Sequence, residues 1–185
     1  SWYQELLDAY HKWVSYGQQW KKERNETIQS LEFPFPYREG QRKMVSSVYH
    51  TILAGRQIFI QAPTGVGKTM STIFPAVRAI GEGKGETLFY LTAKTITRTV
   101  AREAFDVLQK NGLKYKVVTI TAKEKLCFME ETKCNPGDCP YARGHFDRVN
   151  DAVFDLWTTE HVYDREQILE YAKKWQVCPF EMCLD

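Results

Sequence analysis

The first twenty residues carry apolar and aromatic side chains at spacings of three and four. Such spacing places them on one face of a helix, while charged and amide side chains occupy the opposite face. The apolar face consists of Trp2, Leu6, Ala9, Trp13, Tyr16 and Trp20. The pattern predicts a Trp-rich amphipathic linker helix within residues 1–32. We favour a helix that packs on this chain or on a preceding domain, and an exposed face that binds a partner is the alternative.

Further along the chain, the pattern predicts five helices and three short strands. Apolar residues recur at helical spacing in residues 39–53, 70–80, 96–108, 146–157 and 164–175, and Pro75 is expected to kink the second of these helices. Short, mostly apolar runs at residues 57–61, 87–91 and 116–120 have the length of buried strands. Strands that alternate with helices in this way predict an α/β fold, with a parallel sheet covered by helices.

The overall composition is that of a folded globular chain. Of its 185 residues, 43% are hydrophobic and 14% aromatic, which excludes wholesale disorder. No stretch approaches the ~18 uncharged apolar residues of a membrane helix, and no basic-then-apolar leader is visible, so no membrane partner is expected. The chain starts with Ser1 rather than Met and stops abruptly after Leu184 and Asp185, so we expect a piece of a longer protein.

The charge and the cysteine content indicate which classes of protein the chain can belong to. The net charge of +2 is too even to indicate a nucleic-acid binder by itself, although residues 84–125 hold nine basic and four acidic side chains. Five cysteines cluster between Cys127 and Cys183. An odd, clustered set argues against a secreted disulfide framework and for a reduced, cytoplasmic setting with a metal or cluster site. The composition shifts near residue 123, which is the best candidate for a domain boundary. We expect three segments, at residues 1–32, 33–122 and 123–185.

Residues 62–69 read APTGVGKT and lie between a predicted strand and a predicted helix. In that context successive backbone N–H groups can converge on a phosphate, and the helix N-terminus adds partial positive charge. The Lys68 ammonium can bind the β- and γ-phosphates of ATP, and the Thr69 hydroxyl can bind Mg²⁺. The ATP-binding residues of this loop are predicted to be Thr64, Gly65, Val66, Gly67, Lys68 and Thr69. Alanine at position 62, where the strict pattern has glycine, is the form used by helicase-type ATPases.

Four cysteines are separated by seven, five and thirty-nine positions, namely Cys127, Cys134, Cys139 and Cys178. Four thiolates are the number that zinc or an iron–sulfur cluster requires. The tight Cys-x-x-Cys pairs of a zinc ribbon are missing, so the irregular spacing suits a cubane cluster better, while zinc and unliganded core thiols remain open. Cys183 is predicted to be a small buried side chain.

Four motifs, taken in order, resemble the iron–sulfur superfamily 2 DNA helicases, the XPD-like and DinG-like group. They are FPYREGQ at residues 35–41, APTGVGKT at 62–69, ITAKEKLC at 120–127 and WQVCPFE at 175–181. The resemblance runs from about Phe33 to the C-terminus. It implies a partial RecA-like P-loop domain at residues 33–122, followed by the start of a small, cysteine-rich helical iron–sulfur domain at 123–185.

The resemblance also implies roles for individual residues. Gln41 would read the adenine edge, and Lys68 and Thr69 would belong to the catalytic machinery. The residues implied to contact single-stranded DNA are Thr92, Lys94 and Thr95, and those implied to hold a [4Fe–4S] cluster are Cys127, Cys134, Cys139 and Cys178. The implied activity is unwinding of DNA in the 5′→3′ direction, driven by ATP and Mg²⁺, on single-stranded or forked substrates.

Two parts of a working helicase are missing from these residues. The sequence has no Asp-Glu-Ala-His segment to hold Mg²⁺ and position water, and no second RecA-like domain to supply arginines. We therefore expect weak nucleotide binding without useful ATP hydrolysis, and dependence on the remainder of the helicase chain. A zinc- and nucleotide-binding scaffold without motor activity is the alternative from another class.

Overall fold

The computed structural model describes residues 1–93 and 95–184. The chain divides into two compact units. The phosphate-loop unit is Gly17–Tyr115, and the cysteine-bearing unit combines Ser1–Tyr16 with Lys116–Asp185. The first helix, α1 (Trp2–Ser30), contributes its N-terminal half to the cysteine-bearing unit and its C-terminal half to the phosphate-loop unit.

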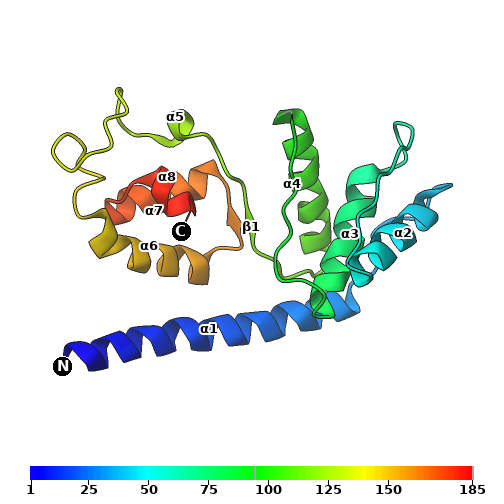
Figure 1. The fold of residues 1–185 in the computed structure, drawn as a ribbon, viewed down its shortest axis with the longest axis horizontal. Helices are drawn as coiled ribbons and strands as arrows, with labels where there is room; N and C mark the ends of the chain where they lie inside the picture. Colours follow the sequence, from blue (N-terminus) through cyan, green and yellow to red (C-terminus); the bar gives the residue numbers. More distant parts are fainter. Residues whose placement is uncertain (94, 185) are drawn as a thin grey trace. The chain divides into compact units, whose positions relative to one another are not determined.

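Three helices form the phosphate-loop unit together with the end of α1. They are α2 (Gln41–Leu53), α3 (Lys68–Gly81) and α4 (Thr95–Lys110), and α3 packs against both of the others (Figure 1). The buried positions of α3 are Met70, Ser71, Ile73, Phe74, Pro75, Ala76, Val77, Ala79, Ile80 and Gly81. A helix buried on nearly every side must be apolar on nearly every side, and Arg78 is its only charged residue after Lys68. The phosphate loop thus leads directly into a deeply buried helix.

The C-terminal end of α1 is held by two features of α3. The Arg78 guanidinium donates to the carbonyls of Ile28 at 2.9 Å and Gln29 at 3.0 Å, which lie in the last turn of α1 and have no partner within it. The Ile28 side chain is 1% exposed and occupies the space that a Cβ at Gly81 would need, since that atom would lie 2.3 Å from Ile28 Cγ2. A glycine at position 81 is therefore what allows α1 to dock.

Besides the N-terminal half of α1, the described residues of the cysteine-bearing unit form four helices and a two-stranded sheet. The helices are α5 (Lys123–Leu126), α6 (His145–Thr159), α7 (Arg165–Trp175) and α8 (Pro179–Leu184). Strand β1 (Val117–Val118) pairs in parallel with β2 (Val162–Tyr163). The core comprises Leu126, Val149, Ala152, Leu156, Tyr163, Ile168, Tyr171, Ala172, Val177 and Met182.

The core anchors the segments that carry two of the cysteines. Leu126 is 1% exposed and Val177 is completely buried, and they immediately precede Cys127 and Cys178. Burial of the two apolar side chains therefore holds both cysteines at the edge of the same core.

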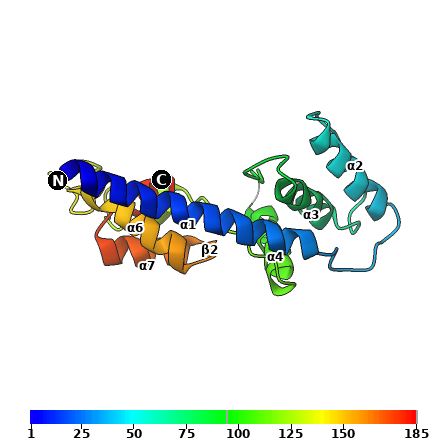
Figure 2. The same cartoon turned by 90° about the horizontal axis from the view of Figure 1, so that it is seen from below.

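The N-terminal half of α1 lies beside α6 in both views of the ribbon (Figures 1 and 2). The Trp13 ring stacks on Trp157 with centroids 5.3 Å apart, and the Tyr16 hydroxyl donates to the Trp157 carbonyl at 3.0 Å. The interpretation of this helix as one that packs on its own chain is confirmed for Trp13 and Tyr16. Trp2, in contrast, is 74% exposed.

The predicted helices are present in the structure, whereas two of the three predicted strands are wrong. Residues 57–61 and 87–91 have no regular secondary structure, and Phe59 and Leu91 are 96% and 88% exposed. Of residues 116–120, two form a strand. An apolar run favours an extended backbone, but a strand also needs a neighbour that offers an unpaired edge. In the described part of the chain, β2 is the only strand that pairs with β1, so the expected three-stranded sheet is not formed.

Across the described residues, no helix combines the length and the apolar character needed to cross a lipid bilayer.

Candidate functional site

The phosphate loop bends sharply before α3. Its two glycines have left-handed backbone angles, with φ of 86° at Gly65 and 79° at Gly67. Gly67 is also the N-cap of α3, and the Ser71 N–H donates to its carbonyl at 3.1 Å. The amides of Lys68, Thr69 and Met70 therefore precede the first hydrogen bond of the helix and point out of its N-terminus, where an anion is stabilised.

Lys68 reaches back over this loop. Its ammonium is exposed and donates to the carbonyls of Ala62 and Pro63, both at 2.9 Å. The half-buried Thr69 follows in the first turn of α3, and Thr64 is exposed at the loop tip. The structure thus brings the predicted phosphate-binding residues together around one bend.

The segment before α2 is bound to the same loop. Gln41 is 3% exposed, and its Oε1 accepts the Arg38 backbone N–H at 3.0 Å. The Gln41 amide lies so close to Gly67 that a Cβ there would be 2.6 Å from Nε2. The Arg38 guanidinium donates to the Gly65 carbonyl. Gln41 therefore lies beside the phosphate loop, and its role in binding nucleotide stays a prediction.

Arg38 contacts the phosphate loop as well, although no role was predicted for it from the sequence. It lies within the FPYREGQ motif, three positions before Gln41, and the resemblance implies a role only for the glutamine. Its basic side chain, close in sequence to Gln41, was the feature from which a contact with the phosphate loop could have been predicted.

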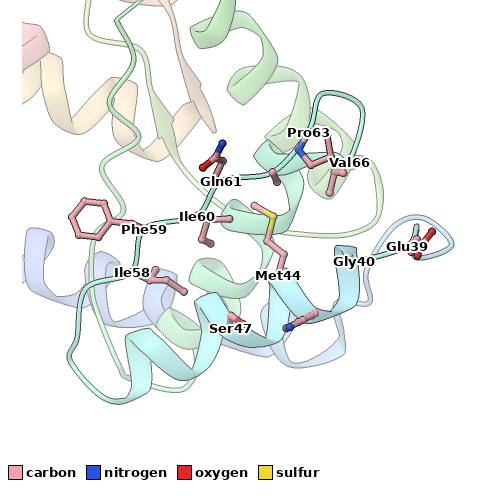
Figure 3. Close-up of a pocket in the computed structure, with 12 residues that line it drawn as sticks. Glu39, Gly40, Met44, Ser47, Ile58, Phe59, Ile60, Gln61, Pro63 and Val66 are labelled. Atoms are coloured by element: carbon pink, nitrogen blue, oxygen red, sulfur yellow. The ribbon is translucent and has the colours of Figure 1, made fainter.

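A cavity of about 680 Å³ adjoins the loop, between α2 and residues 58–63. Figure 3 shows Met44 extending from α2 toward Ile60, while Phe59 points away from α2. Gly40, the residue before Gln41, and Val66 of the phosphate loop also line it. The cavity gives space for part of a ligand whose phosphates lie on the loop.

Two of the three residues predicted to contact DNA, Thr92 and Thr95, are described by the structure. Thr92 is half-buried, and Thr95 is the first residue of α4. Lys94 lies outside the described residues.

All five cysteines are free thiols. Cys139 is buried, Cys127 and Cys178 are half-buried, and Cys134 is exposed. Within residues 1–93 and 95–184, no three histidine, cysteine, aspartate or glutamate side chains form a group able to hold a metal ion. The fifth thiol, Cys183, was predicted to be buried but is half-buried against the core, and this partial burial raises its pKa.

Lys123 lies near two of the predicted cysteine ligands. A hydrogen bond with the Cys134 thiol, aided by the charges of Glu181 and Cys178, raises the pKa of Lys123. Its Nζ is 3.8 Å from Glu181 Oε1. Cys134 and Cys178, which are far apart in the sequence, are thus near one cation.

The chain has a loop bent at two glycines, followed by a buried helix with a lysine and a threonine in its first turn. This arrangement is typical of the P-loop nucleotide-binding proteins. Within this class, the chain belongs to the DEAD/DEAH box helicase family, whose profile matches residues 39–152, more than half of the chain. Helicase chemistry driven by ATP is therefore the activity of its family.

Similar proteins carry helicase names. A 47-residue segment is 43% identical to a Methanocaldococcus jannaschii protein named "Probable ATP-dependent helicase MJ0942", and covers 25% of this chain and 7% of that protein. A 58-residue segment is 43% identical to "ATP-dependent DNA helicase DinG" of Salmonella typhimurium and of Salmonella choleraesuis, and covers 30% of this chain and 8% of each relative. No solved structure matches the chain.

Proposed function

We propose that the chain is the ATP-binding segment of an ATP-dependent DNA helicase. The observation that carries the proposal is the geometry of the phosphate loop, in which a left-handed Gly67 opens α3 and Lys68 lies over the bend. Phosphate oxygens are charged and accept hydrogen bonds more strongly than the neutral carbonyls of Ala62 and Pro63. The Lys68 ammonium can therefore exchange these carbonyls for the β- and γ-phosphates, while Thr69 binds Mg²⁺.

The phosphate-loop unit would be part of a RecA-like domain. Residues 57–61 and 87–91 expose large apolar side chains, most of all Phe59 and Leu91. Such exposure is unusual for consecutive apolar runs and favours segments that pair with other strands. We propose that further parts of the helicase chain supply those strands, together with the Mg²⁺-binding carboxylates and arginines that hydrolysis needs.

DNA is the proposed substrate. Relatives named as DNA helicases support it, as does the backbone around Thr92 and Thr95, because a helix N-terminus can bind a phosphate of the strand. Lys94 would add a charge to this contact. The proposed 5′→3′ direction follows from the resemblance to the iron–sulfur helicases.

A [4Fe–4S] cluster is the proposed partner of the four cysteines. The donor chemistry fits, because Cys127, Cys134, Cys139 and Cys178 are unbridged thiols, and thiolates are the ligands such clusters use. A bound cluster would fix the loop that follows α5 to the start of α8.

The alternative is a zinc- and nucleotide-binding scaffold without motor activity. It is favoured by the same observation, since four thiolates also satisfy zinc. Anaerobic purification followed by iron, sulfide and zinc analysis separates the two. Visible absorption with iron and sulfide supports the helicase proposal, whereas colourless, zinc-loaded protein supports the scaffold.

Turnover provides a second test. We expect the 185-residue chain to bind Mg·ATP but to show no hydrolysis that single-stranded DNA stimulates. DNA-stimulated turnover by this chain alone would contradict its proposed place as one segment of a larger motor.

A further inference from the structure

The first two turns of α6 contact both segments that carry the later cysteines. Arg148 of α6 donates through Nη2 to the Arg143 carbonyl at 2.7 Å and to the Gln176 carbonyl at 2.6 Å. Its Nε donates to the Trp175 carbonyl at 3.0 Å. One guanidinium therefore joins the chain four residues after Cys139 to the chain two residues before Cys178.

A second contact links α6 to Cys178 itself. His145 is 3% exposed, and its Nδ1 accepts the Cys178 backbone N–H at 3.2 Å. The turn between Cys139 and α6 is closed by the Ala142 and Arg143 amides, which donate to the Cys139 carbonyl at 3.2 and 3.1 Å. The positions of Cys139 and Cys178 are thus fixed relative to each other through α6.

The backbone at Gly144 makes room for the guanidinium. Gly144 has φ of 66°, and a Cβ built on it would lie 2.6 Å from Arg148 Nη1. Gly144, the N-cap of α6, thus allows both the left-handed backbone at the cap and the position of the Arg148 guanidinium.

We propose that Arg148 is the positioning residue of the cysteine site, because it joins the turn that follows Cys139 to the segment that precedes Cys178. The inference rests on the proposed thiolate site. Arginine suits this role because its planar fork can donate to several carbonyls in fixed directions, whereas lysine offers a single flexible point charge. Residues that orient metal ligands typically contribute about 10- to 100-fold to metal affinity.

The alternative is that Arg148 only stabilises the end of α7. Arg148 does bind the carbonyls of Trp175 and Gln176, and Gln176 is the left-handed C-cap of that helix. A role confined to stability would lower the unfolding temperature equally with and without metal. A positioning role would reduce the gain in unfolding temperature that metal provides, which gives a readout that separates the two.

The test uses Cd²⁺ as the probe, titrated into the reduced, metal-free chain and followed by thiolate-to-metal charge-transfer absorption. Arg148→Met is expected to weaken Cd²⁺ binding about 10- to 100-fold and to reduce the metal-induced rise in unfolding temperature. Arg148→Lys should recover only part of the affinity. Lys173→Met, which removes an exposed cation from the same unit, should behave as wild type.

Gly144→Ala keeps Arg148 but puts a methyl group against its guanidinium, and it should weaken Cd²⁺ binding in the same direction. This second variant decides the question if Arg148→Met does not fold. Wild-type Cd²⁺ affinity in the folded variants, or a wild-type chain that binds no Cd²⁺ through its thiols, would overturn the inference. Iron and sulfide in the purified wild-type protein test the cluster separately, so failure of the cluster proposal and failure of this inference remain distinguishable.

Discussion

Gly65 and Gly67 both have left-handed backbone angles, but only one of them is also crowded. A Cβ at Gly65 would meet nothing within 4 Å, whereas a Cβ at Gly67 would meet the buried Gln41 amide at 2.6 Å. Gln41 cannot move away freely, because its Oε1 accepts the Arg38 N–H. Substitutions at Gly65 and Gly67 therefore distinguish two effects. Both strain the backbone, but only a substitution at Gly67 displaces Gln41, the side chain proposed to read adenine.

Gly65→Ala and Gly67→Ala should each destabilise the loop by about 1–2 kcal/mol, because left-handed backbone is costly for alanine. Gly67→Ala alone should also reduce the preference for ATP over GTP, since it displaces Gln41. Nucleotide affinities measured by isothermal titration calorimetry check both expectations. Equal loss of base preference in the two variants would contradict the role given to Gln41.

Lys116 presents a different balance, between burial and hydrogen bonding. Its Nζ donates to the carbonyls of Trp157 and Glu160 near the end of α6. Burial lowers the pKa of Lys116 to about 8, while the nearby Glu160 carboxylate acts in the opposite direction. Between that pKa and the ordinary value of 10.5, the unfolded chain holds a proton that the folded chain has released.

The free energy of unfolding should therefore rise with pH through this group, from about pH 8 upward. Between about pH 8 and 9.5 the rise should be about 1.5 kcal/mol, and Lys116→Met should remove it. Urea denaturation across this range measures the difference in slope between wild type and variant. Lys114→Met, which removes an exposed lysine paired with Glu23, is the control and should keep the wild-type slope. An unchanged slope in Lys116→Met would contradict the account of its burial.

At the scale of elements, the docking of α1 on α3 depends on the missing side chain at position 81. A Cβ there would lie 2.3 Å from Cγ2 and 2.8 Å from Cβ of Ile28, and Ile28 is 1% exposed. Gly85, a few residues later, would place its Cβ 3.6 Å from Ile80, which is an ordinary contact. The packing of α1 on α3 should therefore be disturbed by an added methyl group at position 81 but not by one at position 85.

Gly81→Ala should lower the free energy of unfolding by about 1–3 kcal/mol, because extra atoms in a packed contact force neighbours to shift. Gly85→Ala should stay close to wild type. The double variant Gly81→Ala/Ile28→Ala should lose less than the sum of the two single losses, since the methyl occupies part of the space that Ile28 leaves. Additive losses would show that α1 does not dock at Gly81.

At the scale of the whole molecule, the sequence predicted the helices better than the sheet. The helical spacing of apolar residues in 70–80 depends only on this segment, and the structure has a helix there, α3. The run at residues 57–61 carries an equally strong apolar signal, yet Phe59 is exposed, because strand pairing depends on a partner elsewhere in the chain. Local patterns therefore predict helices, while a sheet requires knowledge of which segments meet.

The site shows the same division. The phosphate loop was predictable because its proposed function depends on eight consecutive residues, and its bend is formed by left-handed glycines at positions 65 and 67. Arg38 and Arg148 were not predicted, since their roles arise from carbonyls that folding brings near, such as those of Gly65 and Gln176. The four cysteines were identifiable as a set, and their convergence on one metal or cluster remains a proposal.

The most direct test of the central claim is the affinity of the chain for Mg·ATP in wild type and in Lys68→Ala. Loss of the ammonium removes charge-assisted hydrogen bonds to the phosphates, so the dissociation constant should rise at least about tenfold. The metal content of the cysteine-bearing unit should not change, and the control Lys84→Ala should bind as wild type. Binding of Mg·ATP by Lys68→Ala with wild-type affinity would contradict the assignment of this loop as the nucleotide site.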